Sequence, residues 1–485
     1  MAKLNVIPCP QNIKYLDGSI NLRDLNPLEI QISIDEELKN EEYYIVLKND
    51  EKCFKAGSEK GAFYLRQTLL QLKNQGQIPC IEIHDYPEFS YRGFMLDCAR
   101  HMTKLDDIKK LIDAAALVKM NYMHWHLTDD QGFRLELESH PEITEIGSKR
   151  ASSDFGKYHF NEEYSGYYTK NEIREIVNYA AERFIEVVPE FDLPGHNLAL
   201  LASHPELSCR GEALSVGTKQ GIYDDILCAG NDDSLKVAFD ILEEMCELFP
   251  CKYFHLGGDE APKKRWKECP KCQERIKAEG LKNEEELQGW IVNKAIDFLR
   301  EHNKQAIVWN ESINSSMMPD DCIAQRWMDK KNRCAKYANS GKGVIVSDFF
   351  FFYCDYPYGQ TPLKKTYNHS PYFKGLDENG KSNIAGVEAP IWTEYIRDFD
   401  KLSYMCFPRF TAVAEIGWTS EKNKNLKSFM DRFNAIKNLY DEIGIKPADA
   451  NEWNPNLIES FMQVRRFRKG TFNLNSALNS LETTK

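Results

Sequence analysis

The sequence predicts an α/β protein: a (β/α)8 TIM barrel preceded by a small α+β domain. Two observations lead to this prediction. After residue 88, eight short apolar runs each close on polar or aromatic residues, and amphipathic helices separate several of them. Strands and helices that alternate along a chain form parallel sheets with helical crossovers, and eight such units close a barrel. The 485 residues provide enough chain for a barrel with a second domain.

The first domain is expected over residues 1–87. It contains two strand-like runs, "LEIQISI" and "YYIVLK", followed by one amphipathic helix, "GAFYLRQTLLQLK". The runs resemble hairpin strands and the helix follows them, so we expect a small α+β fold. A proline and several aromatic residues in "HDYPEFSYRG" then interrupt the pattern and indicate the boundary.

The barrel is expected over residues 88–447, and a C-terminal helical extension over residues 448–485. The strand candidates are, in order, "YRGFMLD", "NYMHWHLTDD", "IEVVPEFDLPG", "KYFHLGGDE", "QAIVWNE", "CIAQRW", "GVIVSDFFFFYCD" and "IAGVEAPIWTE". The clearest helices cover residues 105–120, 169–184, 234–249, 286–303 and 426–443. A doubly wound sheet is the structural alternative, but it would not place polar residues in a ring of strand ends.

Composition and charge exclude several kinds of partner. The formal net charge is −12 and the sequence has no long lysine or arginine block, so we expect neither nucleic acid nor a membrane as partner. The first residues lack an apolar run typical of a signal peptide, and we expect a cytoplasmic protein. The oligomeric state stays open.

The fourteen cysteines are scattered along the chain, which favours reduced thiols over a disulfide framework. Cys269 and Cys272 form a "CPKC" motif that could be half of a zinc site or a redox pair. Because the sequence offers no second pair at zinc-finger spacing, we expect a structural role or free thiols there.

Aromatic and acidic residues recur at the candidate strand ends. Residues two apart on a strand share a face, and the C-terminal strand ends of a barrel form its reactive face. Aromatic rings cover the C–H faces of a sugar, and carboxylates accept its hydroxyl protons. This pattern favours a sugar site made of Trp309 and Glu311, Tyr353 and Asp355, Trp392 and Glu394, with Trp327 closing a further run.

Asp259 and Glu260 are adjacent and follow two glycines in "HLGGDE". Neighbouring side chains diverge, so these two acids are poorly placed to act on opposite faces of one scissile bond, as an ordinary glycosidase pair does. We therefore expect each acid to act on a different atom of the substrate.

A metal-dependent hydrolase is the competing interpretation. His124 and His126 share a strand face, which is a spacing that barrel metalloenzymes use. His196 and His255 would be the further ligands. His255, however, precedes Asp259 by four residues and is expected within its strand rather than at its end.

Five segments together resemble glycoside hydrolase family 20, the β-N-acetylhexosaminidases. They are "YRGFMLDCARH", "HWHLTDDQGF", "PEFDLPGH", "HLGGDE" and "GVEAPIWTE", and they extend from about Tyr91 to Glu394. The preceding α+β segment also resembles the non-catalytic N-terminal domain of that family. The resemblance implies substrate-assisted catalysis without a metal or another cofactor.

The resemblance also implies roles for individual residues. Glu260 would be the general acid/base, and Asp259 would hold the 2-acetamido N–H while the acetamido oxygen attacks the anomeric carbon to form an oxazolinium ion. Asp129 and His196 would form a polar chain behind Glu260. The remaining substrate-binding residues would be Arg92, Trp309, Trp327, Tyr353, Asp355, Trp392 and Glu394.

The function expected from these residues is that of an exo-acting, retaining β-N-acetylhexosaminidase. It would release terminal non-reducing β-linked N-acetylglucosamine or N-acetylgalactosamine from glycans, because a pocket closed by tryptophans suits one terminal sugar. A carbohydrate-binding barrel without turnover and the metal hydrolase are the alternatives. Glu260 argues against the first alternative, since binding alone needs no proton donor.

Overall fold

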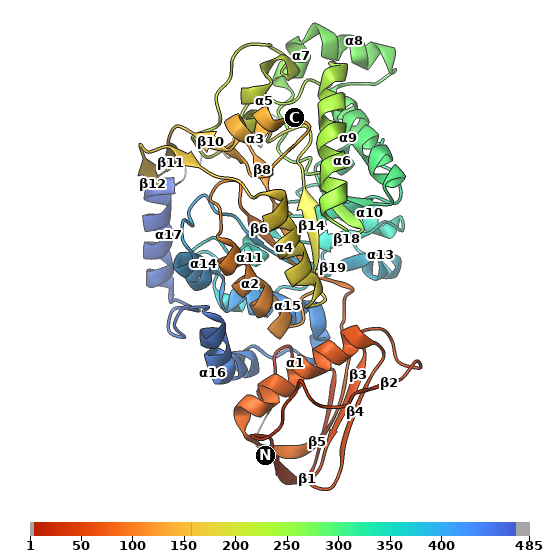
Figure 1. Ribbon diagram of the computed structural model, residues 1–485, viewed down its shortest axis with the longest axis vertical. Coiled ribbons are helices and arrows are strands. Elements are labelled where there is room, and N and C mark those ends of the chain that lie inside the picture. Colours follow the sequence, from red (N-terminus) through yellow and green to blue (C-terminus); the bar gives the residue numbers. More distant parts are fainter. Residues whose placement is uncertain (1–3, 157, 472–485) are drawn as a thin grey trace.

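A computed structural model describes residues 4–156 and 158–471. The chain forms a small N-terminal domain at one end of the molecule and a larger barrel domain beside it (Figure 1). Residues 472–485 of the expected C-terminal extension lie outside the described residues. Within the described part, no helix has both the length and the apolar character needed to cross a membrane.

The N-terminal domain is a five-stranded sheet covered by one helix. The strand order is β1-β5-β3-β4-β2. Helix α1 turns Ala62, Leu65, Leu69 and Leu72 toward the sheet at helical spacing, and the Ser58 side chain caps its first turn. The elements are β1 (Asn12–Asn21), β2 (Ser33–Ile34), β3 (Tyr43–Leu47), β4 (Lys52–Ala56), α1 (Glu59–Gln75) and β5 (Gln77–Asp85).

Eight parallel strands close the barrel, so the predicted fold class is confirmed. Each strand coincides with one of the eight predicted runs, although most are shorter than the run that predicted them. The strands are β6 (Tyr91–Asp97), β7 (Tyr122–His126), β14 (Glu186–Glu190), β15 (Tyr253–His255), β16 (Gln305–Trp309), β17 (Ile323–Arg326), β18 (Val344–Val346) and β19 (Ile384–Ile391).

Helices surround the barrel and short elements follow its strands (Figure 1). The main helices are α2 (Leu105–Leu117), α4 (Lys170–Ala181), α6 (Asp232–Leu248), α9 (Glu284–Glu301), α10 (Arg333–Asn339), α15 (Arg409–Trp418), α16 (Leu426–Ile443) and α17 (Leu457–Thr471). The other helices are α3 (Pro141–Gly147), α5 (Leu198–Ser203), α7 (Lys264–Glu268), α8 (Pro270–Ala278), α11 (Phe349–Phe352), α12 (Leu363–Tyr367), α13 (Glu378–Ser382) and α14 (Phe399–Cys406).

The barrel interior has an apolar layer and a polar layer. The apolar layer, near the N-terminal ends of the strands, includes Tyr91, Tyr122 and Ile307. The polar layer, nearer the C-terminal ends, consists of His124, Glu190, His255, Gln325 and Glu388, all fully buried. Buried charges are tolerated only where they are paired and hydrogen-bonded, and the polar layer pairs histidines with carboxylates.

Arg92 joins the two domains. It is the second residue of β6, so it lies at the N-terminal end of its strand, and it is fully buried. Its guanidinium lies 2.9 Å from Glu41 of the first domain and donates to the carbonyls of Phe89 and Lys119. The expectation that Arg92 binds substrate is therefore wrong, because the strand carries its side chain to the end of the barrel opposite the reactive face.

We expect Arg92→Met to destabilise the protein by about 3–5 kcal/mol, because the change leaves the carbonyls of Phe89 and Lys119 without this donor. It also removes one of the two cations that pair with the half-buried Glu41 carboxylate, the other being Lys60. The midpoint of urea unfolding measures the effect. Lys14→Met is the control: it removes the exposed ion pair with Glu82, and we expect little change. Equal midpoints for the two variants would contradict the interface role of Arg92.

Candidate active site

A pocket opens at the C-terminal ends of the barrel strands. It encloses about 640 Å³ of space between side chains, including its mouth. One side is acidic and the other is mostly aromatic. The residues that line it are Arg100, His126, Asp129, Asp192, His196, Asp259, Glu260, Trp327, Phe349, Tyr353, Asp355, Tyr356, Trp392, Glu394 and Tyr395.

Two glycines shape the turn that follows β15. Gly257 and Gly258 have φ angles of 61° and 94°, in the left-handed region that favours glycine. A Cβ on Gly257 would lie 2.1 Å from the carboxylate of Asp192, and one on Gly258 would lie 2.0 Å from Ser312 Oγ. The Gly258 amide also donates to Asp192 Oδ1 at 2.9 Å. The turn is thus fixed just before the two acids.

Asp259 and Glu260 both reach toward one histidine. His196 Nε2 lies 4.0 Å from Asp259 Oδ2 and 4.0 Å from Glu260 Oε2. Among the described residues, buried Asp259 Oδ1 has no hydrogen-bond partner. Glu260 and His196 themselves have positive φ angles of 44° and 54°. Such backbone strain in residues other than glycine is concentrated at functional sites.

The Glu260 carboxyl has a raised pKa. Loss of water around it, followed by the negative charge of Asp259, raises the pKa of Glu260 to about 7. The side chain still keeps 34% of its surface exposed toward the pocket. A carboxyl of this kind carries a proton near neutral pH and can give it to a bound molecule.

A chain of ion pairs lies behind the two acids. Arg100 Nη2 lies 2.6 Å from Asp129 Oδ2, and Asp129 Oδ1 lies 3.2 Å from His196 Nδ1. Burial opposes ionisation of Asp129, yet Arg100 and His196 hold its pKa below the usual value. Burial likewise opposes the charge on His196, but Asp129 and its neighbours raise the pKa of His196 well above the usual value. The predicted positions of Asp129 and His196 behind Glu260 agree with this arrangement.

Aromatic rings form the opposite wall. The ring of Phe349 packs edge-on against Trp327, Tyr353 and Tyr356, with centroids 5.0–6.1 Å apart. Trp392 continues the wall 6.4 Å from Tyr353. This continuous apolar surface opposite a row of acids is the arrangement expected for a sugar-sized polar ligand.

Asp355 and Glu394 lie at the aromatic side of the pocket. Burial, followed by the charge of Glu394, raises the pKa of Asp355 well above its usual value. Asp355 Oδ1 is buried and, within the part of the chain that the structure describes, lacks a hydrogen-bond partner. A hydroxyl of a bound molecule would supply the missing donor.

The sequence interpretation missed Arg100 and Asp192. Arg100 lies three residues after the end of β6, donates to Gln131 and packs its guanidinium 4.9 Å from the Trp392 ring. It occupies the place assigned to Arg92. Since barrel sites form at C-terminal strand ends, the position of Arg100 after its strand was the signal that could have identified it.

Trp309 lies deeper than expected. Its ring is 6.2 Å from Trp392, but it is 1% exposed and its indole donates to Glu190 Oε1 at 2.9 Å. Trp309 is the last residue of β16 and points into the barrel, so it supports the pocket from below. Glu311 does not pair with it; Glu311 accepts instead from the Trp327 indole at 2.8 Å.

Two histidines of the competing metal site, His124 and His126, have partners on both ring nitrogens. His124 lies 3.1 Å from both Glu190 and Glu388. His126 pairs with Glu190 through Nδ1 and lies 2.8 Å from Asp129 through Nε2. With carboxylates on both ring nitrogens, these two histidines are better explained as charged structural groups than as metal ligands.

We expect Asp259→Asn to lower the pKa of Glu260 below 7 because it removes the nearest negative charge. The pKa should stay above that of a free glutamate, since burial remains. Carbon NMR of glutamate-labelled protein measures it, with Glu260→Gln to assign the signal. Asp355→Asn is the control, and equal shifts in both variants would contradict the role of Asp259.

Comparisons with known proteins agree with this geometry. The profile of the glycosyl hydrolase family 20 catalytic domain matches residues 89–421, and that of domain 2 of the same family matches residues 25–86. A β-hexosaminidase of Porphyromonas gingivalis is 35% identical over 88% of this chain, although the match spans only 62% of that protein. A β-hexosaminidase of Akkermansia muciniphila is 32% identical, and the match covers 88% of each chain.

Solved structures show the same similarity. The crystal structure of a β-N-acetylhexosaminidase superposes with a TM-score of 0.86 and 30% identity, covering 94% of this chain and 99% of the other. An exo-β-N-acetylglucosaminidase from Vibrio harveyi in complex with N-acetylglucosamine gives a TM-score of 0.81 and 27% identity, covering 92% and 78% of the two chains. From its two domains, its pocket and these similarities, the chain belongs to glycosyl hydrolase family 20.

Proposed function

We propose that the protein is an exo-acting, retaining β-N-acetylhexosaminidase that releases terminal β-linked N-acetylglucosamine from glycans. The observation that carries the proposal is the side-by-side placement of Asp259 and Glu260, both facing His196. The names of similar proteins support the substrate class. The Vibrio harveyi exo-enzyme, for example, was crystallised with N-acetylglucosamine.

The acid pair suits a mechanism in which the substrate supplies its own nucleophile. Ordinary glycosidases place two carboxyls on opposite sides of the scissile bond. Here Asp259 is the direct neighbour of Glu260, and its buried Oδ1 has no hydrogen-bond donor among the described residues. The N–H of a 2-acetamido group is such a donor, and accepting it would turn the acetamido oxygen toward the anomeric carbon.

Glu260 acts in both steps. It gives its proton to the glycosidic oxygen while the acetamido oxygen bonds to the anomeric carbon and the glycosidic bond breaks. The leaving alcohol departs, and Asp259 stabilises the positive charge of the oxazolinium ion. Glu260 then takes a proton from water, whose oxygen attacks the same carbon and reopens the ring. Two inversions give net retention.

The remaining pocket residues hold the sugar. The aromatic wall covers its C–H face, Tyr353 donates to the acetamido group, and Asp355 and Glu394 accept from ring hydroxyls. Arg100 is placed to donate to hydroxyl oxygens next to Glu394. Burial opposes its charge, but the carboxylates of Asp129 and Asp97 outweigh burial and raise the pKa of Arg100. A pocket closed on one side by aromatic rings suits the end of a glycan chain, which supports exo action.

We also propose that the protein works in a reducing compartment such as the cytoplasm. Its support is the set of fourteen unpaired cysteines, most of them buried. Secreted proteins with a similar number of cysteines usually join them in disulfide bonds.

We expect Glu260→Gln to reduce hydrolysis of an N-acetylglucosamine disaccharide by about 10²–10⁴-fold, because the variant cannot protonate the leaving oxygen. A p-nitrophenyl β-N-acetylglucosaminide should lose less, since nitrophenolate leaves with little protonation. Glu206→Gln, at an exposed side chain, is the control. Absence of hydrolysis by folded wild-type protein would overturn the proposed function.

A thiazoline mimic of the cyclic intermediate should inhibit the wild-type protein, and it should inhibit the Asp259→Ala variant less.

We expect kcat/KM to decrease above about pH 7, by about tenfold per pH unit. Glu260 has its pKa raised to about 7, so the carboxyl holds its proton below that pH and loses it above. Initial rates at low substrate concentration between about pH 5 and about pH 9 measure the profile. A rate that rises through pH 7 would exclude Glu260 as the proton donor.

A further inference from the structure

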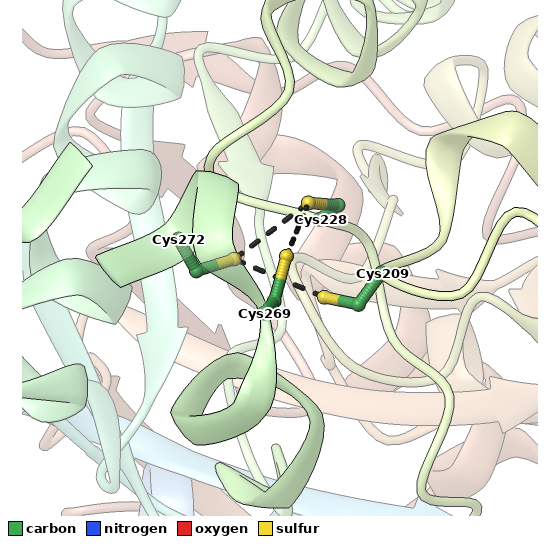
Figure 2. A group of neighbouring side chains, drawn as sticks. All are labelled: Cys209, Cys228, Cys269 and Cys272. Atoms are coloured by element: carbon green, nitrogen blue, oxygen red, sulfur yellow. Dashed lines mark hydrogen bonds between the residues drawn. The ribbon is translucent and has the colours of Figure 1, made fainter. Parts of the chain in front are cut away.

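Four cysteines meet outside the pocket, at the end of the molecule where α7 and α8 lie (Figures 1 and 2). Cys209 follows the short helix η1 (Pro205–Leu207), and Cys228 precedes α6. Cys269 is the N-cap residue of α8, and Cys272 lies in its first turn. The partners that the "CPKC" motif lacked in the sequence therefore come from two loops forty or more residues earlier.

The sulfur atoms form a compact group. Cys228 Sγ lies 3.6 Å from Cys272 Sγ and 3.8 Å from Cys269 Sγ, and Cys209 Sγ lies 3.8 Å from Cys272 Sγ. All four sulfurs lie within 4.8 Å of one another. Four thiolates at about 2.3 Å from a central zinc ion would be about 3.8 Å apart, whereas a disulfide needs about 2.0 Å.

Three of the four thiols are buried away from water. Cys228, Cys269 and Cys272 are 1%, 5% and 0% exposed. A Cβ on Gly230 would lie 2.2 Å from the backbone of Lys271, so this position needs a glycine for the loop to approach the motif.

We propose that Cys209, Cys228, Cys269 and Cys272 bind one zinc ion in a closed, four-thiolate structural site. Each cysteine gives up its thiol proton when the ion binds. Four sulfur ligands in tetrahedral arrangement select a thiophilic ion, and a site with no open position holds structure rather than performing chemistry.

The site would stabilise the loops that carry the catalytic residues. Leu227, next to Cys228, donates its amide to the carbonyl of Pro194, two residues before His196. Cys269 lies nine residues after Glu260, beyond helix α7. A metal that joins these segments would hold the His196 loop and the Glu260 turn together without contacting the substrate.

The test is the metal content of wild-type protein purified without chelator. We expect inductively coupled plasma mass spectrometry to find about one zinc ion per chain. Zinc K-edge X-ray absorption spectroscopy should show sulfur ligands at about 2.3 Å. Cys272→Ser should lose most of the zinc. Cys80→Ser, which removes an equally buried thiol of the N-terminal domain, should keep it.

The outcomes are distinct. Metal-free protein with four titratable thiols, disulfides between these cysteines, or bound iron would each overturn the assignment. If Cys272→Ser fails to fold, cobalt(II)-loaded wild type decides: thiolate-to-cobalt charge-transfer bands support the site and their absence contradicts it. The test does not depend on the proposed function, because an inactive protein would still show its zinc.

Discussion

The C-terminal half of the barrel interior is organised around one buried carboxylate, that of Glu190. Oε1 lies 2.9 Å from the Trp309 indole nitrogen and 2.8 Å from His255 Nδ1. Oε2 pairs with His124 and His126. These partners come from three different strands, so a single charge fixes the spacing of β7, β15 and β16 around β14. A carboxylate without water is stable only when it is compensated in this way.

The same charge reaches the reacting groups through alternating partners. His126 connects Glu190 to Asp129, and Asp129 in turn contacts His196. Charges of opposite sign thus alternate from the barrel centre to the pocket, and each stabilises the next. Glu260 lies at the end of this series beside Asp259, where burial and a like charge keep its proton on the carboxyl. The proton affinity of Glu260 in the pocket therefore depends on the ordered series of ion pairs inside the barrel.

Most of the sequence prediction rested on patterns within a few neighbouring residues. Apolar runs identified the strands, and the adjacency of Asp259 and Glu260 identified the acids, because both properties lie within a few residues. The errors concern residues whose place depends on how far along a strand they lie, or on which distant segments of the chain meet. Arg92 and Arg100 share one motif, but Arg92 lies near the start of β6 and Arg100 lies three residues beyond its end. "GVIVSDFFFFYCD" divides into a short strand and helix α11, so Tyr353 reaches the pocket from a loop. The partners of the "CPKC" motif, Cys209 and Cys228, lie too far away in the chain to form a recognisable motif with it.

Helix α17, the last helix among the described residues, supports one side of the pocket. Phe467 of α17 packs 5.5 Å from Tyr356 and 5.0 Å from Tyr395, and both tyrosines line the pocket. All eight barrel strands and both acids precede α17 in the chain, and the closed barrel contains no residue of this helix. A displacement of α17 would therefore loosen the aromatic wall while the acid pair keeps its place.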